Sequence, residues 1–165
     1  MTQLNSWKLV TYSDASFANV DGTKSQGGYI IYLSDGKQGF PLAWQSQKVK
    51  RVVKSTHAAE TLAMADAAEA SLYYKSFMCE ILGVEDKALF PIHCKTDSAA
   101  LHGAVHSNTQ ILDKRLRIET AMLREMLGKK EVTSVTWVAT SSQHADALTK
   151  AGVISNKILK MTTAP

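Results

Sequence analysis

The sequence predicts an α/β fold, a five-stranded mixed sheet flanked by helices in the order βββαβααβα. Strand-like runs come first, over residues 7–14, 27–33 and 40–46, and the short polar turns between them are typical of antiparallel hairpins. A long helical pattern follows over residues 55–82, after which strand and helix patterns alternate. Early hairpins followed by this alternation indicate one sheet that holds both antiparallel and parallel strands.

The segment over residues 55–82 predicts a single long helix. Ser55 or Thr56 can cap its start, and Gly83 can end it. Apolar and small residues recur at steps of three and four, which predicts a stripe that packs against the sheet. The stripe consists of Thr56, Glu60, Ala63, Ala67, Ala70, Tyr74, Phe77 and Ile81.

The second half of the chain supplies the remaining elements. They are a strand over residues 88–96, a short helix over 98–103, an amphipathic helix over 110–128, a strand over 131–139 and a final helix that begins near Ser142. We expect Trp44 and Trp137, which lie in two of the predicted strands, to pack in the core rather than to stack on bases.

Composition indicates an ordinary globular protein. The 165 residues are 45% apolar and 21% charged, which fits one domain over residues 1–165 with flexible ends at 1–6 and 156–165. No apolar run approaches the ~18 residues of a membrane helix, and the polar start predicts no signal peptide. Cys79 and Cys94 match no disulfide or metal-binding spacing, so we expect free thiols and an intracellular, reducing setting.

Basic residues are unevenly distributed. The net charge is +4, a mild excess that permits a polyanionic partner without requiring one. Two short stretches carry much of the positive charge: Lys48, Lys50, Arg51 and Lys54, and then Lys114, Arg115 and Arg117. Such stretches are either solvated faces or part of a nucleic-acid footprint.

Asp97 lies where the strand over residues 88–96 gives way to a helix. One interpretation is a helix N-cap, because an Asp oxygen accepts a free N–H of the first turn. The other is an active-site role, because open α/β sheets gather functional groups at their strand ends.

Three further acids occupy comparable positions. Glu60 lies on the stripe that faces the sheet, where an unpaired buried carboxylate is unfavourable; its alternative is a capping or dipole interaction. Asp14 ends the first strand and Asp146 lies in the first turn of the last helix, with turn and dipole roles as their alternatives. All four acids can share one sheet edge, where they would repel one another unless Mg²⁺ or Mn²⁺ binds between them. Two such ions about 4 Å apart are a common device for phosphodiester hydrolysis.

Six segments resemble a known family in order along nearly the whole chain. They are YSDASFA (12–18), KSQGGYIIYL (24–33), LAWQSQK (42–48), KSTHAAETLAM (54–64), KTDSAAL (95–101) and HADALTK (144–150). Together they resemble the ribonuclease H domain of retroelement reverse transcriptases, most closely that of copia-type LTR retrotransposons. This resemblance implies a ribonuclease H-like fold whose first three strands are antiparallel.

The resemblance also implies an activity. It is metal-dependent endonucleolytic hydrolysis of the RNA strand of an RNA/DNA hybrid, which leaves 5′-phosphate and 3′-hydroxyl ends. Asp14 would bridge two Mg²⁺ ions, Asp146 would help to hold the ion that activates water, and Glu60 and Asp97 would hold the other ion. Mn²⁺ could replace Mg²⁺. The polymerase part of a reverse transcriptase would be a further partner. The intracellular setting would be the cytoplasm, a virus-like particle or the nucleus.

The sequence departs from the family pattern in two places. Many ribonucleases H carry a loop histidine about ten residues before the last acid, where this chain has Thr136 in a predicted strand. His144 either replaces that histidine in proton transfer or is an ordinary residue at the helix start. The segment between Asp97 and the fifth strand is too short for the additional helix and basic handle of cellular enzymes, so we expect the isolated domain to bind hybrid weakly.

Recognition of a hybrid depends on its shape and its 2′-hydroxyl groups. Small polar groups and backbone amides suit the RNA strand, whereas cations and a helix N-terminus suit phosphates. The candidate binding residues are Ser16, Gln26, Gly27, Gln47, Lys48, Arg51, Lys54, Ser55, Thr56, Ser98, Arg115 and Arg117. The alternative function is a non-catalytic, domesticated module of the same fold that binds hybrids or a partner protein.

Overall fold

The computed structural model describes residues 6–20, 24–50, 52–85 and 88–150, apart from the side chains of residues 18–20 and 115. Its strands are β1 (Lys8–Val20), β2 (Lys24–Ser34), β3 (Gly39–Lys48), β4 (Ile92–Thr96) and β5 (Ser134–Trp137). Its helices are α1 (Thr56–Leu82), α2 (Ala99–His106), α3 (Lys114–Gly128), the 3-10 turn η2 (Thr140–Ser142) and α4 (Asp146–Thr149). The predicted order of elements is confirmed, with the predicted last helix divided into η2 and α4.

The five strands form one mixed sheet in the order β3-β2-β1-β4-β5. β1 pairs antiparallel with β2 and parallel with β4, while β2–β3 is antiparallel and β4–β5 is parallel. The first three strands are therefore an antiparallel meander, as predicted, and β1 is the central strand. Because β1 and β4 run in the same direction, their carboxyl ends lie at the same edge of the sheet.

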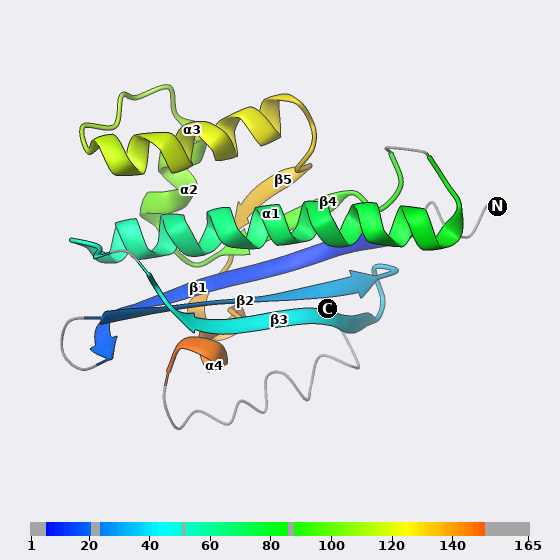
Figure 1. Ribbon diagram of the computed structural model, residues 1–165, viewed down its shortest axis with the longest axis horizontal. Helices are drawn as coiled ribbons and strands as arrows, with labels where there is room; N and C mark the ends of the chain where they lie inside the picture. The colour runs from blue at the N-terminus through cyan, green and yellow to red at the C-terminus, as the bar shows by residue number, and fades with distance from the viewer. Residues whose placement is uncertain (1–5, 21–23, 51, 86–87, 151–165) are drawn as a thin grey trace.

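Helices cover both faces of the sheet (Figure 1). α1 packs on β1 and β2, and α3 packs on α1. The small α4 lies on the opposite face, against β1, β2 and β3. The larger core cluster, which includes Leu9, Met64, Phe90 and Ile92, lies between the sheet and the long helices. Within the described ranges, no helix has both the length and the apolar content needed to cross a membrane.

Helix α1 begins and ends where the sequence predicts. Ser55 is its N-cap and accepts a hydrogen bond from the backbone N–H of Ala58, and Gly83 ends it in the left-handed conformation with φ 62°. The predicted sheet-facing stripe is correct at Glu60, Ala63 and Ala67 and wrong at both ends, since Thr56 is exposed. Phe77 and Ile81 are exposed, because the buried line of α1 passes through Met64, Ala68 and Ser71 instead.

Several other predictions need correction. Trp44 and Trp137 are 65% and 52% exposed rather than buried, because β3 and β5 are the two edge strands of the sheet. β1 is longer than predicted, and β4 and β5 are shorter. Cys94 is buried and Cys79 half-buried, both as free thiols. Of the two predicted flexible ends, residues 1–5 and 156–165 lie outside the described residues.

Candidate active site

Asp14 lies inside β1, not in a turn. It pairs with Gly28 of β2 and is only 5% exposed. The turn interpretation of this residue is therefore wrong. A carboxylate in the central strand of a sheet is almost fully removed from water, and burial of this kind is unfavourable unless the group has partners.

Asp97 follows β4 directly, and strand register brings it beside Asp14. In the parallel pairing of β1 with β4, Tyr12 lies opposite Lys95. Asp14 comes two residues after Tyr12 and Asp97 two residues after Lys95, so the two acids lie at the same edge of the sheet. Ser98, not Asp97, is the N-cap of α2, since its side chain accepts the N–H of Leu101 at 3.2 Å. The capping interpretation of Asp97 is therefore wrong, and its carboxylate is available to the site.

Glu60 reaches the same place from α1. It is 5% exposed, and the backbone N–H of Ala15 donates to its carboxylate. Ser55 is the N-cap, so Glu60 lies beyond the third helical position that a capping box requires. Its Oε2 is buried and has no hydrogen-bond partner among the residues that the structure describes. A buried oxygen without a partner is rare in folded proteins, and this one is free to act as a ligand for a cation.

Asp14, Glu60 and Asp97 form a cluster in which one carboxylate oxygen from each lies within 4.8 Å of the others. Burial, and then the charges of Asp14 and Asp97, raise the pKa of Glu60 to about 9. Burial is also the main cause that raises the pKa of Asp14 to about 6, with smaller contributions from Asp97 and Asp146. Three converging carboxylates, of which Glu60 and Asp14 have raised pKa values, are a donor set suited to a hard divalent cation.

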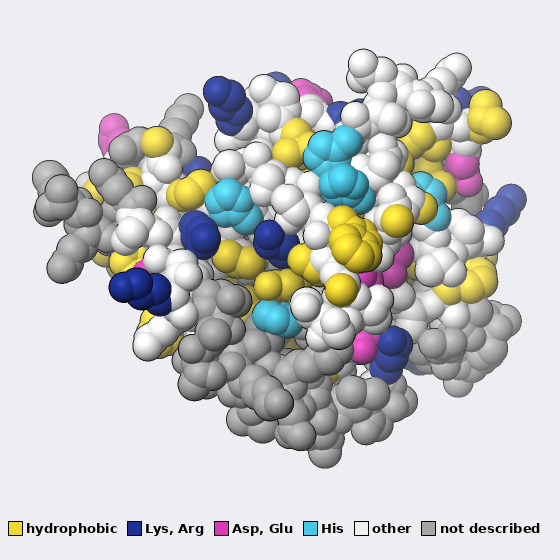
Figure 2. All heavy atoms as spheres, turned by 180° about the vertical axis from the view of Figure 1, so that it is seen from behind, with side chains coloured by type: hydrophobic (Ala, Val, Ile, Leu, Met, Phe, Trp, Pro, Cys, Tyr) yellow, Lys and Arg dark blue, Asp and Glu magenta, His cyan; other side chains and the backbone are white. Residues whose placement is uncertain are grey.

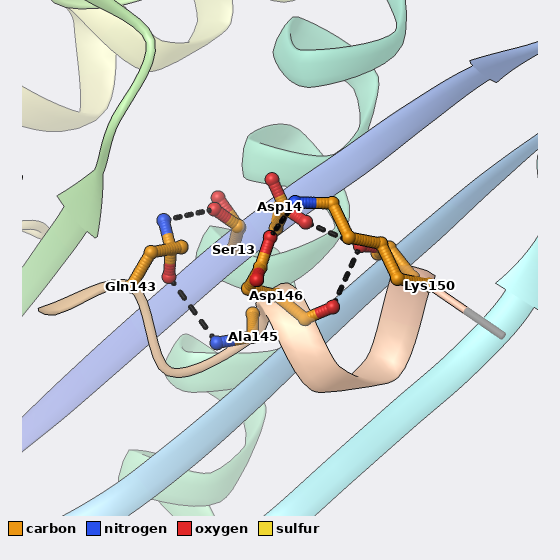
Figure 3. A network of polar contacts seen from close by, with 7 residues as sticks. Ser13, Asp14, Gln143, Ala145, Asp146 and Lys150 are labelled. Atoms are coloured by element: carbon orange, nitrogen blue, oxygen red, sulfur yellow. Dashed lines mark hydrogen bonds and ion pairs between the residues drawn. The ribbon is translucent and has the colours of Figure 1, made fainter. Parts of the chain in front are cut away.

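Asp146 borders this cluster without belonging to the three-residue set. It is the first residue of α4, and its carboxylate contributes to the raised pKa of Asp14. In Figure 3 it lies beside Asp14, with Lys150 across both. The Nζ of Lys150 donates to Asp146 Oδ1, one helical turn away along the chain. This ion pair partly neutralises the acids at the side of the site that faces α4.

Comparisons with solved structures decide the fold. Ribonuclease H1 from the halophilic archaeon Halobacterium salinarum superposes with a TM-score of 0.62 at 21% identity, covering 86% of this chain and 94% of that one. LC11-RNase H1, solved in complex with RNA/DNA hybrid, gives a TM-score of 0.61 at 16% identity, with 86% and 94% covered. The chain has the ribonuclease H fold. The foamy viral protease-reverse transcriptase contains the same fold, at a TM-score of 0.60 and 14% identity over 90% of this chain and 20% of that one.

Sequence relatives of this ribonuclease H-fold chain are retrovirus-related Pol polyproteins from transposons of Arabidopsis thaliana. Those of transposons RE2 and RE1 are 30% and 31% identical over 150 residues. The match covers 88% of this chain and 10% of each polyprotein, so the chain spans about a tenth of their length. No protein-family model matches the chain. The resemblance to ribonuclease H domains of retroelements, noted in the sequence, is confirmed.

His144 lies on the α4 side of the ribonuclease H fold, in an aromatic setting. Its ring stacks on Tyr12 with centroids 3.9 Å apart and meets Tyr32 edge to face at 5.8 Å. The side chain is half-buried, just before α4. Packing alone accounts for this placement, and a role in proton transfer stays a prediction.

The predicted nucleic-acid residues differ in accessibility. Ser16 is 5% exposed, and no described residue forms a hydrogen bond with its buried Oγ. Gly27 is also buried. The exposed or half-buried candidates are Gln26, Gln47, Lys48, Lys54, Ser55, Thr56, Ser98 and Arg117. Arg51 lies outside the described residues, as does the side chain of Arg115. On the face seen in Figure 2 the Lys and Arg side chains are scattered rather than gathered in one patch.

The fold nevertheless brings the two basic stretches together. Lys54 and Lys114, one from each stretch, line the same cavity of about 220 Å³ between the start of α1 and the start of α3. Asp113 and Glu119 line it too, so its charge is mixed. The cavity gives both stretches a common location beside the N-terminus of α1, where phosphate groups are favoured.

Sequence reasoning missed the residues that attach α4 to the sheet. Gln143 is fully buried, and its Nε2 donates to the backbone oxygen of Ser13 at 2.9 Å (Figure 3). Thr149 donates from Oγ1 to Asp14 Oδ2. Trp137 Nε1 donates to the backbone oxygen of Asp97 at 3.0 Å. Thr149 belongs to the quoted HADALTK segment, but nothing in residue type or spacing marks its hydroxyl as a partner of Asp14.

Proposed function

We propose that this chain is a metal-dependent endonuclease that cleaves the RNA strand of RNA/DNA hybrids, and that it is part of, or derived from, a retrotransposon polyprotein. The observation that carries the proposal is the convergence of Asp14, Glu60 and Asp97 within 4.8 Å on a ribonuclease H fold. Its similarity to Pol polyproteins of transposons supports the origin and an intracellular setting. Similar structures that were solved in complex with RNA/DNA hybrid support the substrate.

Two Mg²⁺ ions, with Mn²⁺ as a substitute, would activate a water for in-line attack on the scissile phosphate and stabilise the leaving 3′ oxygen. Asp14, whose pKa is raised in part by both Asp97 and Asp146, would help to hold both ions. Glu60 and Asp97 would hold the ion on the leaving-group side, and Asp146 the ion on the water side. Because the 3′ oxygen is the leaving group, cleavage would give products with 5′-phosphate and 3′-hydroxyl ends.

The residues around the acids support recognition of a hybrid by shape. Gln26 and Gln47 are half-buried polar side chains at the end of the β2–β3 hairpin, and Ser98 begins α2 beside Asp97. Such groups suit 2′-hydroxyls, which distinguish RNA from DNA. Lys54, with the N-terminus of α1, would hold phosphates of the DNA strand. The segment between Asp97 and β5 is too short for both the additional helix and the basic handle of cellular enzymes. We therefore expect weak binding by the isolated chain and a contribution from the polymerase part of a reverse transcriptase.

Cleavage of a labelled hybrid tests the proposal. The purified chain is incubated with Mg²⁺ and RNA/DNA hybrid, single-stranded RNA or duplex DNA. We expect cleavage of hybrid RNA only, and its loss with EDTA or with Asp14→Asn or Asp97→Asn. Glu80→Gln is the matched control, because this acid is exposed near the far end of α1 and should leave the rate unchanged.

The alternative function is a non-catalytic module that binds hybrids or a partner protein. The same samples distinguish it, with binding measured by fluorescence anisotropy and product ends identified by mass spectrometry. Binding of hybrid by the wild-type chain without any cleavage, over a range of Mg²⁺ and Mn²⁺ concentrations, would establish the module and contradict the nuclease.

A further inference from the structure

Thr149 makes a buried contact with the acid at the centre of the cluster. The residue is 5% exposed, and its Oγ1 donates to Asp14 Oδ2 from 135 positions further along the chain. A carboxylate oxygen has two lone-pair sites, so Oδ2 can accept this hydrogen bond and still bind a cation. The hydroxyl therefore restricts the rotation of the Asp14 carboxylate without closing it to a metal.

Hydrogen bonds made by residues before α4 and within α4 fix the position of this hydroxyl. Before the helix, Gln143 accepts the N–H of Ala145 at 3.2 Å and donates to the backbone of Ser13, the neighbour of Asp14. Within the helix, Ser46 of β3 donates to the backbone oxygen of Leu148, and Gln26 of β2 donates to Ser46 at 2.9 Å. Three strands thus hold a four-residue helix in one place.

Close packing adds a third restraint. A Cβ built on Gly28 would lie 2.9 Å from the Cβ of Leu148 and 3.3 Å from Cγ2 of Thr149. Gly28 is the β2 partner of Asp14, so α4 approaches the sheet at the level of the acid it contacts. The absence of a side chain at this position is what allows Thr149 to reach Asp14.

We propose that Thr149 is a positioning residue that orients the Asp14 carboxylate for binding of a divalent cation, an inference that rests on the proposed function. Hydrogen bonds from outer residues to metal ligands fix the orientation of those ligands. The competing explanation is local, because Thr149 Oγ1 also lies 3.2 Å from the backbone oxygen of Asp146 and could serve only to close the turn of α4.

Metal binding without nucleic acid tests the inference. Isothermal titration calorimetry with Mn²⁺ compares the wild-type chain with Thr149→Val, which keeps the shape of the side chain, and Thr149→Ser, which keeps the hydroxyl. We expect Thr149→Val to weaken Mn²⁺ binding by about 10–100-fold, the usual effect of removing an outer partner of a ligand. Thr149→Ser should bind like wild type. If Thr149→Val does not fold, Thr149→Ala replaces it.

Equal or tighter Mn²⁺ binding by a folded Thr149→Val or Thr149→Ala protein would overturn the inference, even if the variant melts at a lower temperature. Cleavage assays give a second measurement: the Mg²⁺ concentration for half-maximal rate should rise in Thr149→Val, and saturating Mg²⁺ should restore most of the rate. If the wild-type chain binds Mn²⁺ but never cleaves hybrid, the proposed function fails while calorimetry still decides the role of Thr149.

Discussion

Glu60 has the most perturbed ionisation in the cluster, and its substitution should separate stability from function. Burial raises the pKa of this carboxyl to about 9, so its ionised form opposes folding when no metal is bound. We expect Glu60→Gln to raise the melting temperature of the metal-free protein at pH 8 by about 2–4 °C, the shift that ~1 kcal/mol gives in a chain of this size.

The same substitution should weaken metal binding, because an amide oxygen is a poorer ligand for a hard cation than a carboxylate. Thermal melts in EDTA and in Mg²⁺ measure both effects on one protein. Glu80→Gln, at an exposed position of the same helix, is the control that should change neither. A lower melting temperature for Glu60→Gln in EDTA would mean that the carboxylate has a stabilising partner.

His144 allows a second prediction at this scale. General acid–base groups contribute about 10²–10⁴-fold to rate, whereas a ring that packs on Tyr12 contributes through structure. We expect His144→Ala to lower the rate of hybrid cleavage less than ~10-fold, and His144→Phe, which keeps a ring for stacking, to lower it still less. Similar losses above ~100-fold in both variants, with melts unchanged, would identify His144 as a proton carrier.

Among the elements, α4 depends most on one position in the sheet. A Cβ at Gly28 would lie 2.9 Å from Leu148 Cβ and 3.2 Å from the backbone oxygen of Gln45, so Gly28→Ala must displace α4 or β3. We expect a loss of about 1–3 kcal/mol in the free energy of unfolding, as in other overpacked sites, together with weaker metal binding.

Gly27→Ala is the matched control for that experiment. A Cβ at Gly27 would meet Val49 and Ala63 at 3.5 and 3.6 Å, which is ordinary van der Waals contact. Urea denaturation of both variants measures the difference. Equal stability of Gly28→Ala and Gly27→Ala would show that α4 is free to move away from the sheet.

Elements with strong local patterns were predictable from the sequence, and so were the acids at their ends. Ser55 and Gly83 bound α1 through local backbone chemistry, and the end of β4 placed Asp97. Contacts made only after folding were not predictable. The bond between Thr149 and Asp14 joins residues 135 positions apart, and the exposure of Trp44 depends on β3 being an edge strand.

For the whole molecule, the cluster predicts that pH and divalent cations act in opposite directions on stability. Glu60 has its pKa raised to about 9 in the folded chain, above an unfolded value of ~4.3. Between these values the folded state holds more protons than the unfolded state, so stability falls as pH rises. Burial lowers the pKa of His57 and of His93 below 6.5. These histidines make stability rise with pH, but this rise is complete by about pH 7.

Cys94 limits the usable range, because burial raises the pKa of its thiol from 9.0 to about 12, so the unfolded chain begins to lose this proton above about pH 8 while the folded chain keeps it. The window from pH 7 to 8 therefore isolates Glu60. We expect the free energy of unfolding in EDTA to fall across it by at most ~1.4 kcal/mol per pH unit, the slope for one proton. Millimolar Mg²⁺ should reverse the loss, since a cation that binds only the folded state stabilises it by mass action. Urea denaturation at several pH values measures both effects, with Glu60→Gln as the control that should show a flat profile. A metal-free stability that rises from pH 7 to 8 would contradict a buried Glu60 carboxyl that holds its proton, and would remove the reason for this site to bind a cation.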